Sequence, residues 1–208
     1  MTKKYPKVSI IITNYNYSEF LSRCIRSCLS QEGVATETII VDDCSTDNSN
    51  KVLDDFSKDA RIVKNKKNIG VAESSNKGVR LARGQFTIRV DADDFIKNDT
   101  CFFLSRYLED NHDAFCVSCD YHLVDKYENV IIRKSAEEFP ISCGIMYRRD
   151  LFLELGGYNP KMRHREEEEL RKRLGEDYTI DHLKIPLYRY RMHDTNKTKT
   201  KEYLETKI

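Results

Sequence analysis

The sequence lacks long apolar runs and an excess of charge of either sign. No apolar stretch approaches the roughly 18 residues of a membrane-spanning helix, and the apolar run at residues 8–12 is too short for a signal-peptide core. The 35 Lys and Arg residues nearly balance the 34 Asp and Glu residues, so the net charge is +1. Nucleic-acid binders need a broad basic face, so we expect no nucleic-acid partner. We expect a cytoplasmic protein, and leave open a peripheral contact with the inner face of the membrane.

Paired cysteine frameworks are also missing. The seven cysteines are an odd number, and Cys116 and Cys119 form a single CxxC, whereas a zinc ribbon needs two such pairs at suitable spacing. A free Cys packs as a small hydrophobe, and reduced thiols are the default without an export signal. We therefore expect buried, inert thiols, with a redox role for the CxxC as the alternative.

The glycine-rich loops that hold phosphate in many nucleotide-binding proteins are absent. The chain has neither GxxxxGK[ST] nor a GxGxxG after its first predicted strand. This argues against a P-loop NTPase and against a dinucleotide-binding fold, both of which hold phosphate at a glycine-rich helix N-terminus. A nucleotide diphosphate would need another device, such as a metal ion bound by carboxylates.

A dense group of carboxylates is present instead. In residues 86–95, FTIRVDADDF, alternating apolar side chains predict a strand that runs into Asp91, Asp93 and Asp94. Carboxylates this close repel one another, and they stay ionised together only if a cation or several donors lie among them. Mg²⁺ or Mn²⁺ suits such oxygen ligands. Taken alone, the motif fits a solvated acidic turn equally well.

Strand-like and helix-like patterns alternate through the first half of the chain. β-branched or alternating runs at 8–12, 38–41, 61–63 and 86–90 are separated by amphipathic segments at 20–29, 52–56 and 71–82. This predicts an α/β fold with a parallel sheet covered by helices on both faces. Ligands bind beyond the carboxyl ends of such strands. Because each of three predicted strands ends in polar side chains, we expect those ends to meet in one crevice.

The second half has a less regular pattern. We expect strands at 114–118, 130–133, 143–147 and 187–192, helices at 101–108 and 150–155, and a charged helix at 166–174. The chain has no internal repeat or low-complexity block. Its 208 residues are enough for one domain with a sizeable core, so we expect a single domain over residues 1–208. The Lys- and Thr-rich tail at 195–208 has little to bury, so we expect it to be mobile or weakly docked.

Six segments in order resemble one known family. They are VSIIITNYN, SCLSQ, IIVDDCSTDNS, NIGVAESSNKG, ARGQF and VDADDF, and the resemblance covers roughly residues 7–195. The chain resembles the inverting glycosyltransferases of family 2. This implies the GT-A fold, a Rossmann-like, mostly parallel sheet with helices on both faces and a smaller mixed region on the acceptor side. It also implies a nucleotide-sugar-binding half at 1–98 and an acceptor and catalytic half at 99–194.

The resemblance implies a set of donor-binding residues. Asp43 matches the acceptor for the ring N–H of the base, Asp42 supports the strand end, and Asp91 matches the carboxylate that faces the ribose. Asp93 matches the metal ligand, and Asp94 orients its neighbours through hydrogen bonds from the following turn. The full expected nucleotide-sugar site is Thr13, Asn14, Tyr15, Asp42, Asp43, Asn68, Gly70, Asp91, Ala92 and Asp93.

The resemblance places the catalytic base on the charged helix. The family has a Glu-Asp pair a few residues before a Leu and an Arg, and aligning Leu170 and Arg173 puts Glu166 and Glu167 on that pair. Glu167 is the expected general base and Glu166 the second choice, although the family usually has Asp at this position. The alternative is a solvated helix held by i,i+4 ion pairs such as Glu169 with Arg173.

His193 follows the last predicted strand, where a His completes the metal site in related enzymes. The expected ligands of Mn²⁺ or Mg²⁺ are therefore Asp93 and His193. The expected reaction moves a sugar from a nucleotide-diphosphate sugar, UDP by default because the family uses it most, to a hydroxyl of a glycan, lipid-linked or other acceptor in bacterial-type surface polysaccharide or glycoconjugate synthesis. A non-catalytic nucleotide-sugar-binding protein or subunit is the main alternative. A nucleotidyltransferase ranks lower because its Gly- and Arg/Lys-containing loop is missing.

Overall fold

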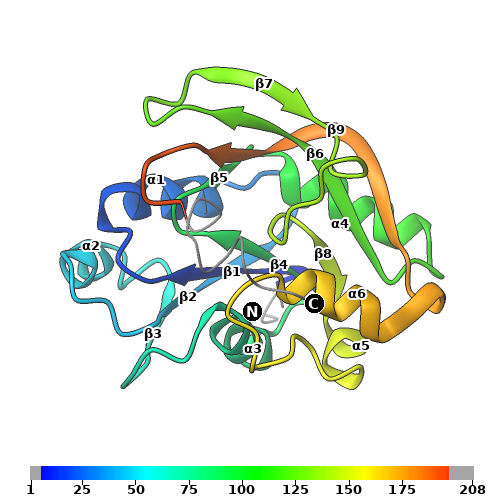
Figure 1. The fold of residues 1–208 in the computed structure, drawn as a ribbon, viewed down its shortest axis with the longest axis horizontal. Coiled ribbons are helices and arrows are strands. Elements are labelled where there is room, and N and C mark those ends of the chain that lie inside the picture. The colour runs from blue at the N-terminus through cyan, green and yellow to red at the C-terminus, as the bar shows by residue number, and fades with distance from the viewer. Residues whose placement is uncertain (1–5, 197–208) are drawn as a thin grey trace, which may run out of the picture.

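The computed structural model describes residues 6–196, which form one curled nine-stranded sheet with helices on both sides (Figure 1). The strand order is β3-β2-β1-β4-β8-β6-β9-β5, and β7 pairs with β6. The strands are β1 (Val8–Asn14), β2 (Thr36–Asp42), β3 (Arg61–Lys64), β4 (Phe86–Asp91), β5 (Phe95–Ile96), β6 (Cys116–Val124), β7 (Val130–Lys134), β8 (Met146–Arg148) and β9 (Ile180–Arg191). The helices are α1 (Ser18–Leu29), α2 (Ser49–Asp55), α3 (Val71–Leu81), α4 (Thr100–Asp110), α5 (Arg149–Glu154) and α6 (Glu166–Leu174), followed by a short 3₁₀ turn at Gly175–Asp177.

The first half forms the predicted parallel sheet. β3, β2, β1 and β4 run parallel, and all seven residues of β1 are buried because helices cover both faces. Ile10 packs on one face with Leu21 of α1 and Leu53 of α2, whereas Ile11 packs on the other with Val79 of α3. Each such side chain contributes roughly 1.5–3 kcal/mol of transfer free energy when it is fully buried.

The second half extends the same sheet instead of forming a separate one. β8 pairs antiparallel with β4 and β6, while β6 pairs parallel with β9 and antiparallel with β7. In Figure 1 the β6–β7 hairpin and β9 lie along the top of the molecule, and α3, α5 and α6 lie at the bottom. The predicted α/β class, with a Rossmann-like half and a mixed region beside it, is confirmed.

Several element bounds differ from the prediction. The last strand, expected at 187–192, begins seven residues earlier at Ile180. Pro186 and irregular register opposite Asp120 interrupt the alternation of side chains, so periodicity detects only the second part of this strand. The strand expected at 143–147 is shorter and lies at Met146–Arg148.

The remaining expectations concern the cysteines, the tail and the membrane. All seven thiols are free, and six of them are buried. The tail begins docked, since Asn196 is buried and its side chain bonds the backbone of His193 and Arg191; residues 197–208, to which the rest of that expectation applies, lie outside the described residues. None of the helices within residues 6–196 combines the length and apolar character needed to span a bilayer.

Candidate active site

A crevice opens at the carboxyl ends of β1, β2 and β4, and the start of α6 closes its opposite side. It brings together most of the side chains predicted from the sequence: Thr13, Asn14, Tyr15, Asp43, Asp91, Ala92, Asp93, Glu166 and Glu167. Asp42, Asn68, Gly70 and His193 do not line it, but each hydrogen-bonds a residue that does. Carboxylates from separate strands therefore face a glutamate-bearing helix across one opening.

Asp43 organises the edge where a base would bind. Its buried carboxylate accepts hydrogen bonds from the backbone N–H groups of Ile69 and Gly70, both at 2.8 Å, and from Asn65 Nδ2 at 2.9 Å. A carboxylate offers about four acceptor positions, so one remains for a ligand N–H. Gly70 has φ +88°, and a Cβ there would lie 2.8 Å from Arg163 Nη1. The loop before α6 thus reaches the same edge.

Asp42 acts within the protein instead. Its Oδ1 accepts from Asn14 Nδ2 at 2.7 Å and Ser45 Oγ at 2.6 Å, and its Oδ2 accepts from the Ser45 N–H at 3.0 Å. These bonds tie the ends of β1 and β2 to the following loop. Ala92 likewise is fully buried and belongs to the core.

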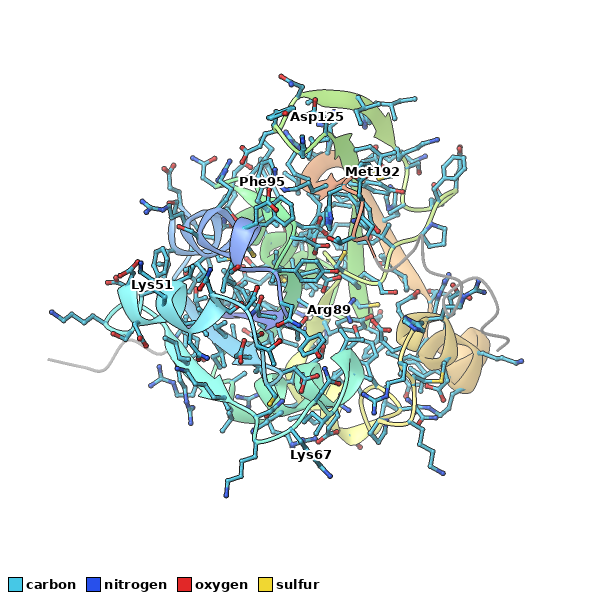
Figure 2. The ribbon with its side chains drawn as sticks, turned by 60° about the vertical axis from the view of Figure 1, so that its left-hand side comes forward. Lys51, Lys67, Arg89, Phe95, Asp125 and Met192 are labelled. Atoms are coloured by element: carbon cyan, nitrogen blue, oxygen red, sulfur yellow. The ribbon has the colours of Figure 1, made fainter. Side chains whose placement is uncertain are left out.

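Arg89 is a site residue that the sequence interpretation missed. Its side chain is 5% exposed, its Nε lies 3.0 Å from Asp91 Oδ1, and its Nη1 forms an ion pair with Glu166. Figure 2 shows it near the centre of the molecule. A buried cation between two carboxylates links the donor side of the crevice to the N-terminus of α6. The sequence does contain a signal for this role, because Arg89 lies within a strand that was expected to be covered on both faces, where a charged side chain needs a partner.

Replacing Arg89 by Met should strongly destabilise the fold. Glu166 would remain buried without its cation, and breaking a buried pair in this way costs about 3–5 kcal/mol. Urea unfolding at pH 7 measures the loss. The matched control is Arg80→Met, which breaks an exposed pair with Glu73 and should cost at most about 1 kcal/mol. Equal midpoints for the two variants would contradict this role for Arg89.

Asp93 and His193, the two predicted metal ligands, lie next to each other. Asp93 Oδ2 lies 3.0 Å from His193 Nε2, and His193 Nδ1 lies 2.9 Å from Thr195 Oγ1. The imidazole also packs against Phe20. Ligands on adjacent octahedral positions at about 2.1 Å from a cation lie about 3 Å apart, so this oxygen–nitrogen pair fits Mn²⁺ or Mg²⁺. The Thr195 hydroxyl can fix the tautomer that the metal requires.

Asp94 is buried behind the metal-ligand pair. It accepts hydrogen bonds from Tyr188 Oη and the Arg191 N–H, both at 2.8 Å, and from Cys143 Sγ at 3.7 Å. The expected partners in the following turn are thus replaced by partners from β9 and from the segment before β8. Burial, with the charges of Asp93 and Asp91, raises the pKa of Asp94. Asp91, Asp94 and Cys143 also place one potential ligand atom each within 4.8 Å of one another. A thiol suits softer metals than Mg²⁺ or Mn²⁺, so Asp93 with His193 fits these cations better.

Glu166 and Glu167 begin α6 in different environments. Both are buried and both line the crevice, but Glu166 is paired with Arg89 from the sheet whereas Glu167 is paired with Arg171 on its own helix. The alternative interpretation of this helix, ion pairing between residues i and i+4, applies to Glu169, which lies 3.2 Å from Arg173. Glu166 is therefore committed to an ion pair with the sheet, while Glu167 has only a half-exposed partner.

The environment of Glu167 suits a general base. Burial raises the pKa of Glu167 to about 7, and the nearby Arg171 opposes that rise. The charges of Glu168 and Glu166 on the same helix add to the rise in the pKa of Glu167. The charge of Glu167 in turn raises the pKa values of Cys116, Tyr147 and Tyr158 in the packed core. A carboxylate with a pKa near neutrality accepts a proton more readily than an ordinary surface Glu.

Comparison with known proteins identifies the family of the chain. The model of the family described as Glycosyl transferase family 2 matches residues 9–174. The chain is 33% identical over 131 residues to chondroitin synthase from Escherichia coli, covering 62% of this chain and 19% of that protein. It is 32% identical over 169 residues to the uncharacterized glycosyltransferase alr2836 from Nostoc sp., covering 70% and 52%. The chain thus spans about half or less of the length of these relatives.

Solved structures share the fold at low sequence identity. Staphylococcus aureus TarS 1–349 in complex with UDP-GlcNAc matches with a TM-score of 0.78 and 18% identity, covering 91% of this chain and 60% of that one. The mannosyltransferase PcManGT from Pyrobaculum calidifontis, in complex with GDP-Man and Mn²⁺, matches with a TM-score of 0.73 and 18% identity, covering 93% and 59%. The GT-A fold is confirmed, and the chain belongs to glycosyl transferase family 2.

Proposed function

We propose that this chain transfers a sugar from a nucleotide-diphosphate sugar to a hydroxyl acceptor with inversion at the anomeric carbon. The observation that carries the proposal is the common crevice of Asp43, Asp93 and Glu167, which come from β2, β4 and α6 ends. Support for a UDP-sugar donor comes from the structurally similar TarS, whose solved complex contains UDP-GlcNAc. The names of several relatives point to polysaccharide synthesis as the setting.

Donor binding is assigned to the strand ends. Asp43, held by the 69–70 backbone, accepts the N–H of the base, while Thr13 and Asp91, whose side chains lie 3.5 Å apart, face the ribose. Asp93 and His193 would hold a divalent cation, which would supply Lewis-acid stabilisation of the departing diphosphate. The buried Arg89 keeps the Asp91 carboxylate oriented through their ion pair.

Glu167 has the catalytic role. Its carboxylate takes the proton of the acceptor hydroxyl as that oxygen bonds to the anomeric carbon, while the bond from this carbon to the diphosphate oxygen breaks. Attack from the face opposite the leaving group inverts the configuration. The nucleoside diphosphate leaves with the bond electrons, and Glu167 later releases its proton to solvent.

Calorimetry beside a turnover assay tests the proposal. UDP should bind in the presence of Mn²⁺, and a panel of nucleotide-sugars, first ranked by thermal shift, should include one that releases the nucleoside diphosphate on turnover. Binding without hydrolysis or transfer for any donor would favour the non-catalytic nucleotide-sugar binder. Neither binding nor turnover would reject both functions.

The rate should depend on the ionisation of Glu167. Because the base acts in its ionised form and its pKa is about 7, the transfer rate should rise with pH through about 7 and level off above it. The rate measured from about pH 5.5 to about pH 9 at saturating donor and metal checks this. A rate that is flat through this interval, or that falls, would show that another group limits proton transfer.

A further inference from the structure

A second hollow lies away from the crevice, between α1, β5 and β9. It measures about 350 Å³, and its lining includes Arg23 and Arg26 of α1, Lys97 just after β5, and Arg189 of β9. One water needs only about 10–15 Å³ by this measure, so a polyatomic ligand fits. The hollow shares no lining residue with the crevice. It is therefore a separate feature of the surface.

The charge of this hollow is out of proportion to that of the chain. Four of its nine lining residues are cationic and none carries a carboxylate, whereas the whole chain has a net charge of +1. Arg23 is paired with Glu128, and Lys97 Nζ lies 3.6 Å from Asp99. Within residues 6–196, Arg26 and Arg189 have no carboxylate in ion-pair range. Like charges in one concavity repel one another. A bound anion would therefore reduce the electrostatic repulsion between these cations.

Two of the guanidinium groups are already held in place. Arg23 stacks over the Phe95 ring at 4.2 Å, and Figure 2 labels Phe95 beside α1. Arg189 Nη1 donates to the carbonyl oxygens of Pro186 and Tyr188 at 3.0 and 3.2 Å, which leaves its Nε and Nη2 N–H groups for a ligand. Such pre-organisation lowers the entropy cost of binding.

The local potential is positive at a neighbouring side chain as well. Burial, and after it the charges of Arg189, Arg133 and Lys97, lower the pKa of His122. Burial lowers the pKa of Arg189 itself, and the charge of Asp99 opposes that shift. The four cations that line the hollow come from helix α1, strand β9 and the segment after β5. Oxygens that point in several directions, as on a phosphoryl group, suit this better than a planar carboxylate, which one arginine can hold in a bidentate pair.

We propose that the hollow between α1, β5 and β9 is an anion site that binds a phosphoryl group. Free phosphate compounds and lipid headgroups share this chemistry. The site does not depend on the proposed transfer reaction, since it uses none of the residues assigned to that reaction.

Titration of two charge-matched double variants with pyrophosphate tests the site. Inorganic pyrophosphate is titrated into the full chain, with the crevice saturated by UDP and Mg²⁺, and the thermal shift is followed. Arg26→Gln with Arg189→Gln should weaken pyrophosphate binding at least tenfold. The control, Lys51→Gln with Lys67→Gln, removes the same charge from exposed positions elsewhere and should leave affinity within twofold. Equal affinities for both double variants, or an equal loss in both, would overturn the proposal.

Two further measurements keep the result unambiguous. Removing repelling cations should leave the melting temperature of the Arg26/Arg189 variant without ligand unchanged or raised, so lost binding will not reflect misfolding. Co-sedimentation with phosphatidylglycerol vesicles, against phosphatidylcholine vesicles, separates the two sources. Wild-type binding to the anionic vesicles that pyrophosphate displaces identifies a lipid headgroup, and pyrophosphate binding alone identifies a free phosphate compound.

Discussion

Glu167→Gln should lower sugar transfer by about 10²–10⁴-fold while donor binding stays within about twofold. The amide keeps the shape of the side chain but accepts no proton, and general-base catalysis contributes about this factor. Initial rates at saturating donor and acceptor, beside calorimetric titration with UDP and Mn²⁺, separate the two effects. Donor binding should persist because Asp43, Asp91 and Asp93 lie on the opposite side of the crevice.

Two variants on the same helix make the result specific. Glu169→Gln weakens an ion pair with Arg173 and a long hydrogen bond from Asn159. It should change the rate by less than about threefold, since such an ion pair is worth about 0.3–0.5 kcal/mol. Glu166→Gln tests the second choice for the base. Near-normal transfer by Glu167→Gln, with loss in Glu166→Gln, would move the base to Glu166.

The stability of Glu167→Gln distinguishes lost chemistry from lost structure. The pKa of Glu167 in the fold, about 7, lies above the value of 4.5 for an ordinary Glu, so the folded state holds this proton more tightly than the unfolded chain does. Wild-type stability should therefore fall as pH rises from about 4.5 to about 7, by roughly 3 kcal/mol. The Gln variant should lack this fall and be at least as stable as wild type at about pH 8.

Asp93→Ala should abolish metal-dependent transfer, with a loss of at least about 10³-fold. The substitution removes the carboxylate oxygen that lies 3.0 Å from His193 Nε2 and leaves the imidazole as a single ligand. Stabilisation of the leaving diphosphate by a metal is worth several kcal/mol, and each 1.4 kcal/mol is about tenfold in rate. The measurement is transfer rate against Mn²⁺ concentration, followed for wild type and variant.

The matched control is another aspartate close in sequence. Asp99 is partly exposed and pairs with Lys97 at the surface, so Asp99→Ala should keep both the rate and the metal dependence. Asp93→Asn retains a hydrogen-bond partner for His193 and should fold like wild type while losing metal dependence. If Asp93→Ala responded to Mn²⁺ as the wild type does, the metal would have to bind elsewhere, such as at Asp91 and Asp94.

The parallel half of the fold was predictable because its signals are local. β-branched runs such as residues 8–12 mark buried strands, and polar pairs such as Asp42 with Asp43 mark their ends. Because the carboxyl ends of parallel strands lie at one edge of the sheet, these polar ends could be predicted to form one crevice. The start of β9 was missed because Pro186 and a register irregularity hide its period.

The charges inside the site were harder to read. Glu166 and Glu167 are adjacent and chemically identical, and only the fold shows that one is paired with Arg89 from the sheet and the other with Arg171 on the helix. Arg89 and Arg163 gain their roles from partners 77 and 95 residues away. Long-range pairs of this kind leave no periodic trace in a sequence.

The strand order has a consequence for engineering this chain. β5, at the end of the amino-terminal half, does not stay with β1–β4 but pairs with β9 at the far edge of the sheet, so strands of the first half flank those of the second. A chimera joined near residue 98 would therefore contain two strand pairings between different parent proteins, β4 with β8 and β5 with β9. Donor specificity should be easier to transplant through the loops after β1 and β2 than by exchanging whole halves.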